Sequence, residues 1–465
     1  MYRRLNRNQL SIEEFFLPFG GRLSADNRWV KLAKMMPWDL IEDLYAKNFV
    51  GDKSDGRPPI PARIAYGAIY IKEQEGLTDR QTVEYTLENP YAQYFLGLTV
   101  FQQEPLFDDS MMARFRMRFT AEMIEAINEE LYRRSNPPKP PEDGGNDGKL
   151  ILDASAAPAD VRYPTDLSLL NECRENTEAI IDQIWEESGL SGRKIFYNRK
   201  KAKAKYLKVA KQRKPRKFQI KQAIKEQIGF VQKNLEVIDK LAADVWEVLE
   251  PKHIVRLETI RKVLEQQTLM IKTGTHTVED RIVNLRQPHV RPIVRGKLSA
   301  PVEFGQKISI SVVRGYTFIE RQSWDNFAEG GTLIESANKY KDRHGVYPEA
   351  IIADKTYRNR TNIRFCKENG IRLTGPRLGR PKKEELEADR NQAYMDSCER
   401  NMVESRFGIG KRRYGLGLIM ARLPFTALSE AAMNIFVMNV ALLLRTFLRL
   451  IFNRLYRLLP NWICT

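Results

Sequence analysis

The sequence predicts an α/β domain, in which a mixed sheet is flanked by helices. A helical N-terminal domain precedes it and a long basic helical insertion interrupts it. Residues 28–134 read as short helices, whereas apolar runs at 149–152 and 350–353 read as buried strands that each end at an aspartate. Between these runs, residues 172–271 are helical in pattern and rich in lysine and arginine. Strands that alternate with helices in this way indicate an α/β domain.

The N-terminal residues predict several short helices. One helix is expected to run from Pro61 to about position 74, where Gly76 stops it. Thr78 and Gln81 predict a capping box for the next helix. Ser110 is expected to cap a later helix, which carries Arg114, Arg116 and Arg118. Such helices fit a helix-turn-helix with one helix in a DNA major groove, or equally a small bundle that only dimerises.

The clearest boundary lies at residues 135–148, where prolines, glycines and acids cannot build a core. The expected domains are a helical domain at 1–134, a linker at 135–148, the α/β domain at 149–171 and 272–417, the insertion at 172–271 and an apolar helical segment at 418–465.

The α/β domain is expected to begin with a strand that ends at Asp153. Strands follow at 302–310 and 316–322, with Arg314 and Gly315 as their hairpin turn. The further elements are a helix at 333–343, the strand at 350–353, a helix at 362–369, a strand at 371–374, a basic loop at 375–383 and a helix at 394–411.

The net charge of +17 is concentrated in one segment of the 465 residues. Lysine or arginine occupies positions 193, 194, 199, 200, 201, 203, 205, 208, 211, 213, 214, 216, 217 and 221, and the same span contains no acid. Such a cluster indicates a polyanion partner. The alternative is a solvated loop that binds nothing.

The cysteines and histidines exclude several kinds of site. The four cysteines form no CxxC pair, which argues against a zinc module and a disulfide framework. The four histidines form no HxH or HExxH pair, which excludes hydrolases built on paired histidines.

No membrane partner is expected. The most apolar segment, 425–452, is interrupted by polar residues, so a packed or partner-facing helix fits it better than a membrane span. The basic N-terminus has no apolar run behind it, so no secretory signal is expected either, and the sequence predicts a cytoplasmic protein.

Two aspartates are candidates for metal-dependent phosphodiester chemistry. Such cleavage is helped by two divalent metals about 3.5–4 Å apart, and carboxylates are the ligands suited to Mg²⁺. Asp153 and Asp354 each follow an apolar strand, although acids at strand ends are often ordinary turn residues.

The helix at 394–411 carries a third candidate acid. Helical spacing puts Arg400, Glu404 and Lys411 on one face, with Val403 and Phe407 beside them to anchor the helix. Glu404 is then placed to reach the metals, and the two basic residues are placed to contact phosphates. The plain alternative is a solvated pair of Arg400 and Glu404.

With these residues in view, nearly the whole chain resembles the bacterial insertion-sequence DDE transposases, in the broad group related to the insertion-sequence-five elements. Residues 56–98 (GRPPIPARIAYGAIYIKEQEGLTDRQTVEYTLENPYAQYFLGL) and 108–119 (DDSMMARFRMRF) resemble that group's helical transposase domain. ILDAS matches its first-Asp strand and ADKTY its second-Asp motif, with Thr356 in place of the usual glycine. Arg400, Glu404 and Lys411 reproduce its YREK-type signature, except that Ser397 stands where the tyrosine is expected.

The resemblance implies an RNase H-like catalytic fold with Asp153, Asp354 and Glu404 as catalytic residues and metal ligands. It implies two Mg²⁺ ions, with Mn²⁺ as a substitute. It also implies binding to double-stranded DNA at terminal inverted repeats and target sites, strand cleavage by water, strand transfer by a 3′-hydroxyl, and a homodimer.

Basic residues in three segments are the DNA-binding candidates. They are Arg400 and Lys411 in the last helix, Lys200, Lys201, Arg213, Lys214, Arg216 and Lys217 in the insertion, and Arg377 and Arg380 in the basic loop. The loop resembles a minor-groove hook, with a plain basic loop as the alternative. Trp324 has two readings, a base-stacking residue or part of a core.

Three other functions compete with this reading. One is a domesticated, inactive relative that binds DNA, and another is a nuclease that never joins strands. The third is a tyrosine recombinase, because His253 and Arg256 have HxxR spacing, although the next tyrosine is Tyr316 in a predicted strand.

Overall fold

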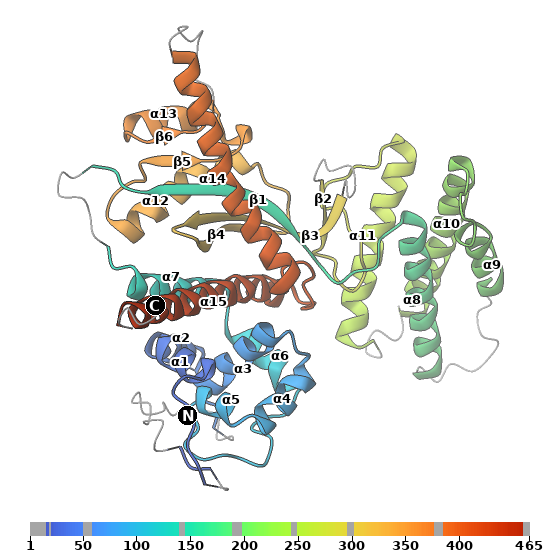
Figure 1. Cartoon of the computed structure of the whole chain (residues 1–465). Coiled ribbons are helices and arrows are strands. Elements are labelled where there is room, and N and C mark those ends of the chain that lie inside the picture. The colour runs from blue at the N-terminus through green and yellow to red at the C-terminus, as the bar shows by residue number, and fades with distance from the viewer. Residues whose placement is uncertain are drawn as a thin grey trace. The chain divides into compact units, whose positions relative to one another are not determined.

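The computed structural model describes residues 15–17, 20–49, 58–138, 145–187, 198–242, 249–294, 302–375 and 385–458 (Figure 1). Contacts divide the chain into two compact units. Unit 1 contains Met1–Pro158, Lys307–Ser323 and Phe327–Thr465, and unit 2 contains Ala159–Gln306 and Trp324–Asn326. Unit 2 therefore begins before the expected insertion at 172–271 and ends after it.

Unit 1 begins with short helices. They are α1 (Arg28–Met35), α2 (Trp38–Ala46), the 3-10 turn η2 (Lys47–Phe49), α3 (Ala62–Glu75), α4 (Asp79–Glu88), α5 (Pro90–Phe95), α6 (Met111–Arg118) and α7 (Ala121–Ser135). As predicted, α3 ends at Gly76, which has a φ of 68°, and Thr78 and Gln81 form a capping box on α4. Ser110 stands at the predicted N-cap position of α6, but its side chain makes no capping hydrogen bond, and its backbone N–H donates to Asp108.

Two arginines of α6 are engaged within unit 1. Arg116 donates to both carboxylate oxygens of Asp79, at 2.8 and 2.7 Å, and Arg118 donates to the hydroxyl of Tyr45 at 2.9 Å. Arg114 is exposed. Arg116 and Arg118 therefore hold the helices together. The helix-turn-helix and the dimerising bundle both stay predictions.

The strands form one mixed sheet. They are β1 (Lys149–Pro158), β2 (Arg291–Val294), β3 (Val302–Val313), β4 (Tyr316–Ser323), β5 (Ala350–Ile352) and β6 (Arg372–Leu373). Within the described residues, their order is β2-β3-β1-β5-β6, and β4 also pairs with β3. β5 is parallel to β1 and β6, whereas β3 is antiparallel to β2 and β4. The predicted mixed sheet is confirmed, and Arg314 and Gly315 form the β3–β4 turn with φ of 50° and 86°.

Helices cover this sheet, and α12 and α13 share its apolar core (Figure 1). They are α12 (Leu333–His344), α13 (Arg360–Glu368) and α14 (Glu385–Arg413), with the 3-10 turns η4 (Glu329–Thr332) and η5 (Lys355–Tyr357). Leu152 of β1, Ile351 of β5 and Tyr340 of α12 lie in one apolar cluster. α14 contacts β1 and β5, so it lies over the middle of the sheet.

The C-terminal helix α15 (Pro424–Leu458) packs inside unit 1, against α7, α3 and β4. Tyr66 and Tyr70 of α3 meet Phe436 with ring centroids 5.7 and 6.1 Å apart. Asn439, one of the polar residues that interrupt the apolar run, hydrogen-bonds both the N–H and the carbonyl of Thr317. By length and composition alone, Pro424–Leu448 could cross a membrane. Its apolar window is 56% buried, however, and buried core helices have the same length and composition.

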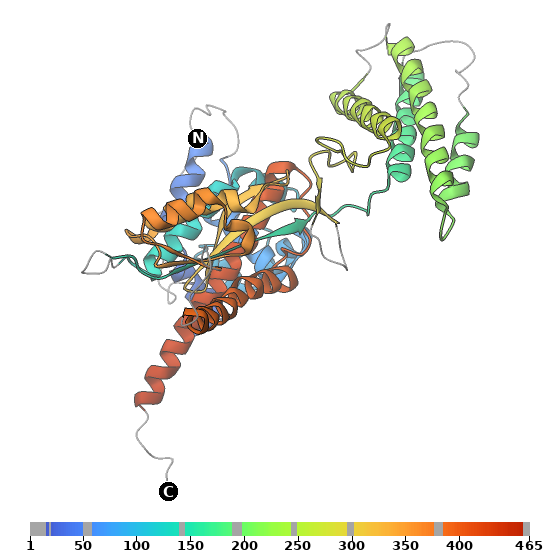
Figure 2. The same ribbon diagram turned by 90° about the horizontal axis from the view of Figure 1, so that it is seen from above.

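Unit 2 is mainly a set of helices that lie alongside one another (Figure 2). They are α8 (Asp166–Glu187), α9 (Arg199–Ala210), α10 (Lys217–Ala242) and α11 (Pro251–Thr273). Ile181 of α8, Val231 of α10 and Ile260 of α11 belong to one buried cluster. The predicted helical insertion therefore has a core of its own.

Candidate active site

Asp153 lies within β1 and not at its end, so the expected strand end at this acid is wrong. β1 continues to Pro158, and Ala156 and Ala157 are buried. Alanine is depleted in strands, which explains why the sequence pattern ended the strand too early. The Asp153 carboxylate accepts a hydrogen bond from the N–H of Ala154 at 2.9 Å.

Asp354 lies just after β5, the strand that pairs in parallel with β1. The two strands pair in parallel with Lys149 opposite Ala350 and Ile151 opposite Ile352. Continuing this register brings Asp354, just after the end of β5, opposite Asp153. Asp354 also accepts a hydrogen bond from the residue after it, at 2.7 Å, and it caps η5. Because β1 and β5 run in the same direction, both carry their candidate aspartate toward the same end of the paired segment.

Helix α14 brings Arg400 and Glu404 to this pair of acids. One guanidinium nitrogen of Arg400 lies 3.3 Å from Asp354, and another lies 3.2 Å from Glu404. Arg400 therefore joins the second aspartate to the third candidate acid. The pair of Arg400 and Glu404 is more than the solvated helix pair considered from the sequence, because Asp354 shares the guanidinium.

Three contacts fix α14 on the sheet. Val403 is fully buried and Phe407 is 7% exposed, as expected for the anchoring side of the helix. Lys149 at the start of β1 forms an ion pair with Glu399. At β6, Arg372 makes two hydrogen bonds to Asp396, at 2.7 and 2.9 Å. Arg400 and Glu404 are thus carried by a helix that is tied to strands on both sides of β5.

Lys411 and the two candidates for the signature tyrosine's role also lie on α14. Lys411 is half-buried in the last turn of the helix. Ser397 is exposed, and Tyr394, one turn before it, is 70% exposed. Among the described residues, neither Ser397 nor Tyr394 makes a side-chain hydrogen bond that would assign it a role.

The electrostatics of Asp153 suit a cation. Burial raises the pKa of Asp153 to about 6, the N–H of Ala154 opposes this, and the charges of Glu329 and Glu404 add to it, with Arg400 acting in the opposite direction. The oxygen donors of three carboxylates fit a hard divalent ion such as Mg²⁺ in chemical type. Within the described residues, however, no three acidic, histidine or cysteine side chains stand close enough to hold a metal, and Arg400 lies on two of the acids.

Glu329 is the residue at this site that sequence reasoning missed. It begins η4, which packs against η5, and its carboxylate lies 3.0 Å from the ammonium of Lys307 on β3. Gly330 fits there because a Cβ would stand 2.5 Å from the carbonyl oxygen of Thr356. No motif surrounds Glu329, so only the fold brings this acid to Asp153.

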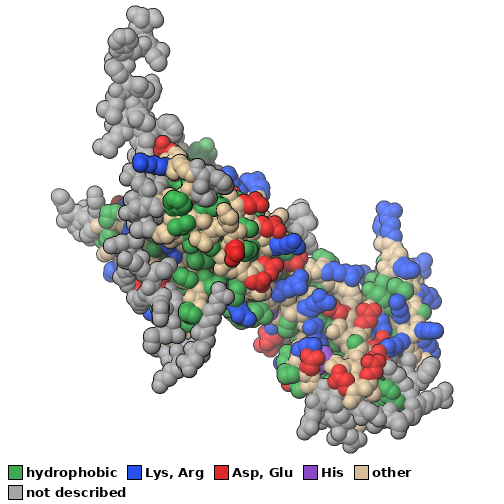
Figure 3. Space-filling model, turned by 90° about the horizontal axis from the view of Figure 1, so that it is seen from below, with side chains coloured by type: hydrophobic (Ala, Val, Ile, Leu, Met, Phe, Trp, Pro, Cys, Tyr) green, Lys and Arg blue, Asp and Glu red, His purple; other side chains and the backbone are tan. Residues whose placement is uncertain are grey.

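The predicted DNA-binding residues of the insertion lie on the surface of unit 2. Lys200 and Lys201 on α9, Arg213, Lys214 and Arg216 in the turn after it, and Lys217 at the start of α10 are all exposed. Figure 3 shows lysine and arginine side chains gathered on this helical unit. Phe218, which is 65% exposed, lies among them. The basic surface that the sequence predicts is therefore exposed.

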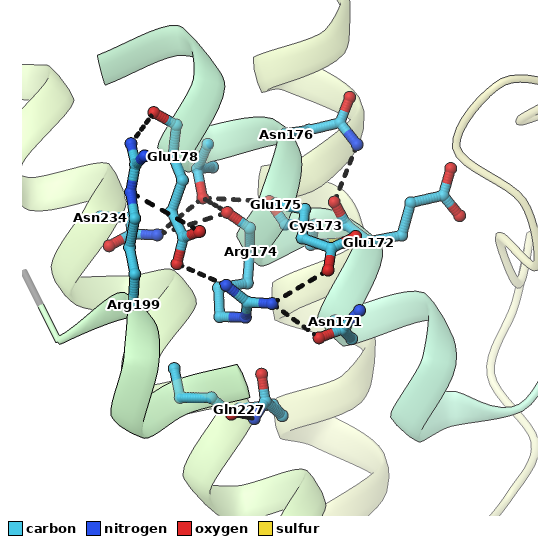
Figure 4. A network of polar contacts seen from close by, with 12 residues as sticks. Asn171, Glu172, Cys173, Arg174, Glu175, Asn176, Glu178, Arg199, Gln227 and Asn234 are labelled. Atoms are coloured by element: carbon cyan, nitrogen blue, oxygen red, sulfur yellow. Dashed lines mark hydrogen bonds and ion pairs between the residues drawn. The ribbon is translucent and has the colours of Figure 1, made fainter. Parts of the chain in front are cut away.

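Two basic residues of the same run are used inside unit 2. Arg199 donates to the carbonyl of Glu178 at 2.7 Å and to Asp182 at 2.5 Å, and Lys205 pairs with Glu226 at 2.9 Å. Arg199 thereby joins α9 to a buried network on α8, in which Arg174, 2% exposed, pairs with Glu178 (Figure 4). These contacts fix α9 on the other helices of unit 2, and Lys200 and Lys201 of the same helix remain exposed.

The remaining candidates separate into three cases. Arg377 and Arg380 lie outside the described residues, at 376–384. Trp324 packs in a small core of unit 2, with its ring centroid 4.3 Å from that of His289. Of the two roles considered for this residue, the structure supports core packing. Tyr316, the nucleophile that a tyrosine recombinase would need, is 6% exposed in β4.

Comparisons with known proteins point to one class of protein. Residues 351–441 match the family model described as "Transposase DDE domain", and residues 18–118 match the model described as "Transposase domain (DUF772)". A protein of Rhizobium meliloti, named "Uncharacterized protein ORF8 in nfe locus", is 28% identical over 145 residues, which are 30% of this chain. Those residues are 66% of that relative, slightly less than two thirds of its length. No solved structure matches the chain.

Proposed function

This chain carries the two transposase domains that are typical of insertion-sequence DDE transposases, and from this premise we propose that it binds the terminal inverted repeats of an insertion sequence and cuts and joins DNA there. The observation that supports the proposal is the parallel pairing of β1 with β5, because the two candidate aspartates follow the paired residues of these strands at the same spacing. Acids at random strand ends have no reason to face one another, whereas a shared reaction centre needs them together.

An RNase H-like fold of the catalytic domain is part of the proposal. The strand order supports it: β1 lies in the middle, with the hairpin of β3 and β4 on one side and the parallel strands β5 and β6 on the other. In mixed sheets of this kind the ends of the central parallel strands are the natural place for a site.

We assign Asp153, Asp354 and Glu404 as the catalytic residues and as the ligands of two Mg²⁺ ions, with Mn²⁺ as a substitute. When bound, the ions would stabilise charge on the attacking and leaving oxygens of a phosphodiester. The chain supplies the rest. β1 and β5 hold two carboxylates rigidly, and Arg400 orients Asp354 and Glu404 toward each other.

DNA binding is assigned to the exposed basic surface of unit 2 and to the basic residues of α14. The unit 2 residues are Lys200, Lys201, Arg213, Lys214, Arg216 and Lys217, those of α14 are Arg400 and Lys411, and Arg377 and Arg380 complete the set. Exposed lysine and arginine side chains without acids between them attract a phosphate backbone at any base sequence.

Two further parts of the proposal concern assembly and location. We expect a homodimer, because two element ends must be cut together, and a cytoplasmic, nucleoid-associated protein in a bacterium. The part of α15 from Thr426 to Val440 is buried inside unit 1, so it is not accessible to a second copy of the chain as a dimer surface.

The test is cleavage and joining of a labelled element-end duplex with Mg²⁺ or Mn²⁺, with wild type beside Glu404→Gln. Metal-dependent products that disappear in the variant support DDE chemistry. Equal cutting by both proteins means that Glu404 is not the third acid. If both proteins bind DNA and neither cuts, the chain is a DNA-binding relative, which is the second candidate function. The observation that favours this candidate is that the described acids form no group of three close enough to hold a metal. Cutting without joining identifies a nuclease.

A further inference from the structure

Helix α13 carries a row of basic side chains that no motif singled out. Arg360, Arg364 and Lys367 are spaced four and three residues apart, so they fall on one face of the helix. All three are exposed, and none of their side chains has a hydrogen bond or ion pair with another described residue. Arg358, just before the helix, differs, since it donates to the carbonyls of Leu373 and Thr374.

This row begins next to Asp354. The 3-10 turn that Asp354 caps leads directly to Asn359, whose side chain caps α13. Asn362, 3% exposed, donates to the carbonyls of Gly330 and Tyr357 at 2.7 and 2.8 Å. These contacts hold the first turn of α13 rigidly beside the aspartate.

The placement of Arg360 works against the stability of the helix. The N-terminal end of a helix carries partial positive charge, so acids in its first turn stabilise it and bases do not. The first turn of α13 contains Arg360 and no acid. A basic residue at this end is unfavourable for the free chain and becomes favourable when an anion lies against it.

We propose that Arg360, Arg364 and Lys367 form a phosphate-binding face that holds the DNA backbone beside Asp354, whatever the base sequence. The occupant is DNA because a row of unpaired bases complements a row of phosphates. At about 1.5 Å per residue, Arg360 and Lys367 are separated by about 10 Å along the helix, which spans about three nucleotides at about 3.4 Å each. The proposal rests on the proposed function and adds a surface to it.

The experiment measures how DNA affinity depends on salt. A labelled duplex of arbitrary sequence is titrated by fluorescence anisotropy between about 50 and 200 mM salt. Each neutralised phosphate contact should lower the slope of log K against log salt by about 0.9. The variant with Arg360→Gln, Arg364→Gln and Lys367→Gln should therefore lose about 2.7 from the slope, and Arg364→Gln alone about 0.9.

Two controls separate this face from general charge. The variant with Arg133→Gln, Arg134→Gln and Lys341→Gln removes the same charge from α7 and α12 of unit 1, and its slope should equal that of wild type. The variant with Arg360→Lys and Arg364→Lys keeps the charge and should keep the slope. Circular dichroism melts check that each variant is folded, and glutamine on an exposed helix face leaves the core intact.

The outcomes are distinct. An unchanged slope in the α13 variant, while neutralising Lys200 and Lys201 lowers it, overturns the α13 proposal and leaves the proposed function standing. An equal loss in the α7–α12 control also overturns it, because net charge then explains the effect. Wild type that binds no duplex at low salt overturns the proposed function together with this surface.

Discussion

The guanidinium of Arg400 lies 3.3 Å from the carboxylate of Asp354, and this ion pair joins α14 to the residues that follow β5. The same side chain reaches Glu404 on its own helix at 3.2 Å. Without Arg400, Asp354 and Glu404 would face each other with no positive charge between them.

Arg400→Gln should slow DNA cleavage by about 10–100-fold, the usual loss when a residue that orients metal ligands is removed. Affinity for DNA should change much less, because one of many basic residues is lost. Single-turnover cleavage and anisotropy measure the two effects separately. Arg390→Gln, an exposed residue of the same helix, is the control, and an equal loss of rate there would rule out a role specific to Arg400.

Glu329→Gln should shift the acidic limb of the cleavage profile to lower pH. The charge of Glu329 helps to raise the pKa of Asp153, and its removal should lower that pKa below about 6. Asp153 is then ionised, and able to bind a cation, in more acidic solution. Glu335→Gln, on the next helix, is the control. A profile of Glu329→Gln that coincides with that of wild type contradicts the influence of Glu329 on Asp153.

Glu125 on α7 should make the protein less stable as pH rises from about 4.5 to about 7. Burial raises its pKa to about 7 in the folded chain, although the charge of Lys339 opposes this shift and those of neighbouring acids add to it. In that interval the unfolded chain therefore binds fewer protons, and the free energy of unfolding falls as pH rises. Above about 7 the loss is complete.

Glu125→Gln imitates the protonated acid and should remove that dependence, with a gain of at most about 3 kcal/mol above pH 7. Urea unfolding at several pH values measures it, with Glu88→Gln on the exposed face of α4 as the control. Glu125 borders a cavity of about 330 Å³ between α7, β4 and α12, so the amide has room. If the two variants show the same pH dependence, the role given to Glu125 is wrong.

Gly330→Ala should destabilise the protein by about 1–3 kcal/mol, as overpacking does, and should also slow cleavage. The added Cβ would meet the carbonyl of Thr356 at 2.5 Å, in the turn that follows Asp354. Gly331→Ala is a matched control, because a Cβ there meets nothing within 4 Å. Thermal melts and cleavage rates should separate the two neighbours.

The sequence predicted best the features that depend on local chemistry. The capping box at Thr78, the helix end at Gly76 and the hairpin turn at Arg314 and Gly315 are all present. Each is determined by a few adjacent residues. The end of β1 at Asp153 was wrong because the following alanines favour no strand, and only pairing in the sheet extends it.

Features that depend on contacts between residues far apart in the chain could not be predicted from the sequence. Glu329 reaches the site through the packing of η4 on η5, and nothing near it in the chain marks it as special. Arg199 and Lys205 looked like the other bases of their run, yet they bind acids of α8 and α10. Spacing can predict a face of a helix, but only the fold decides which basic residues are already paired.

The packing of α15 has a consequence for the order of folding on the ribosome. The helices that are synthesised early complete their core around Phe436, which is synthesised much later. These helices therefore wait for α15, a pattern of high contact order that folds slowly. Unit 2, whose helices pack on one another, is free to fold earlier. A nascent chain would then present a finished basic bundle before the aspartates meet Glu404.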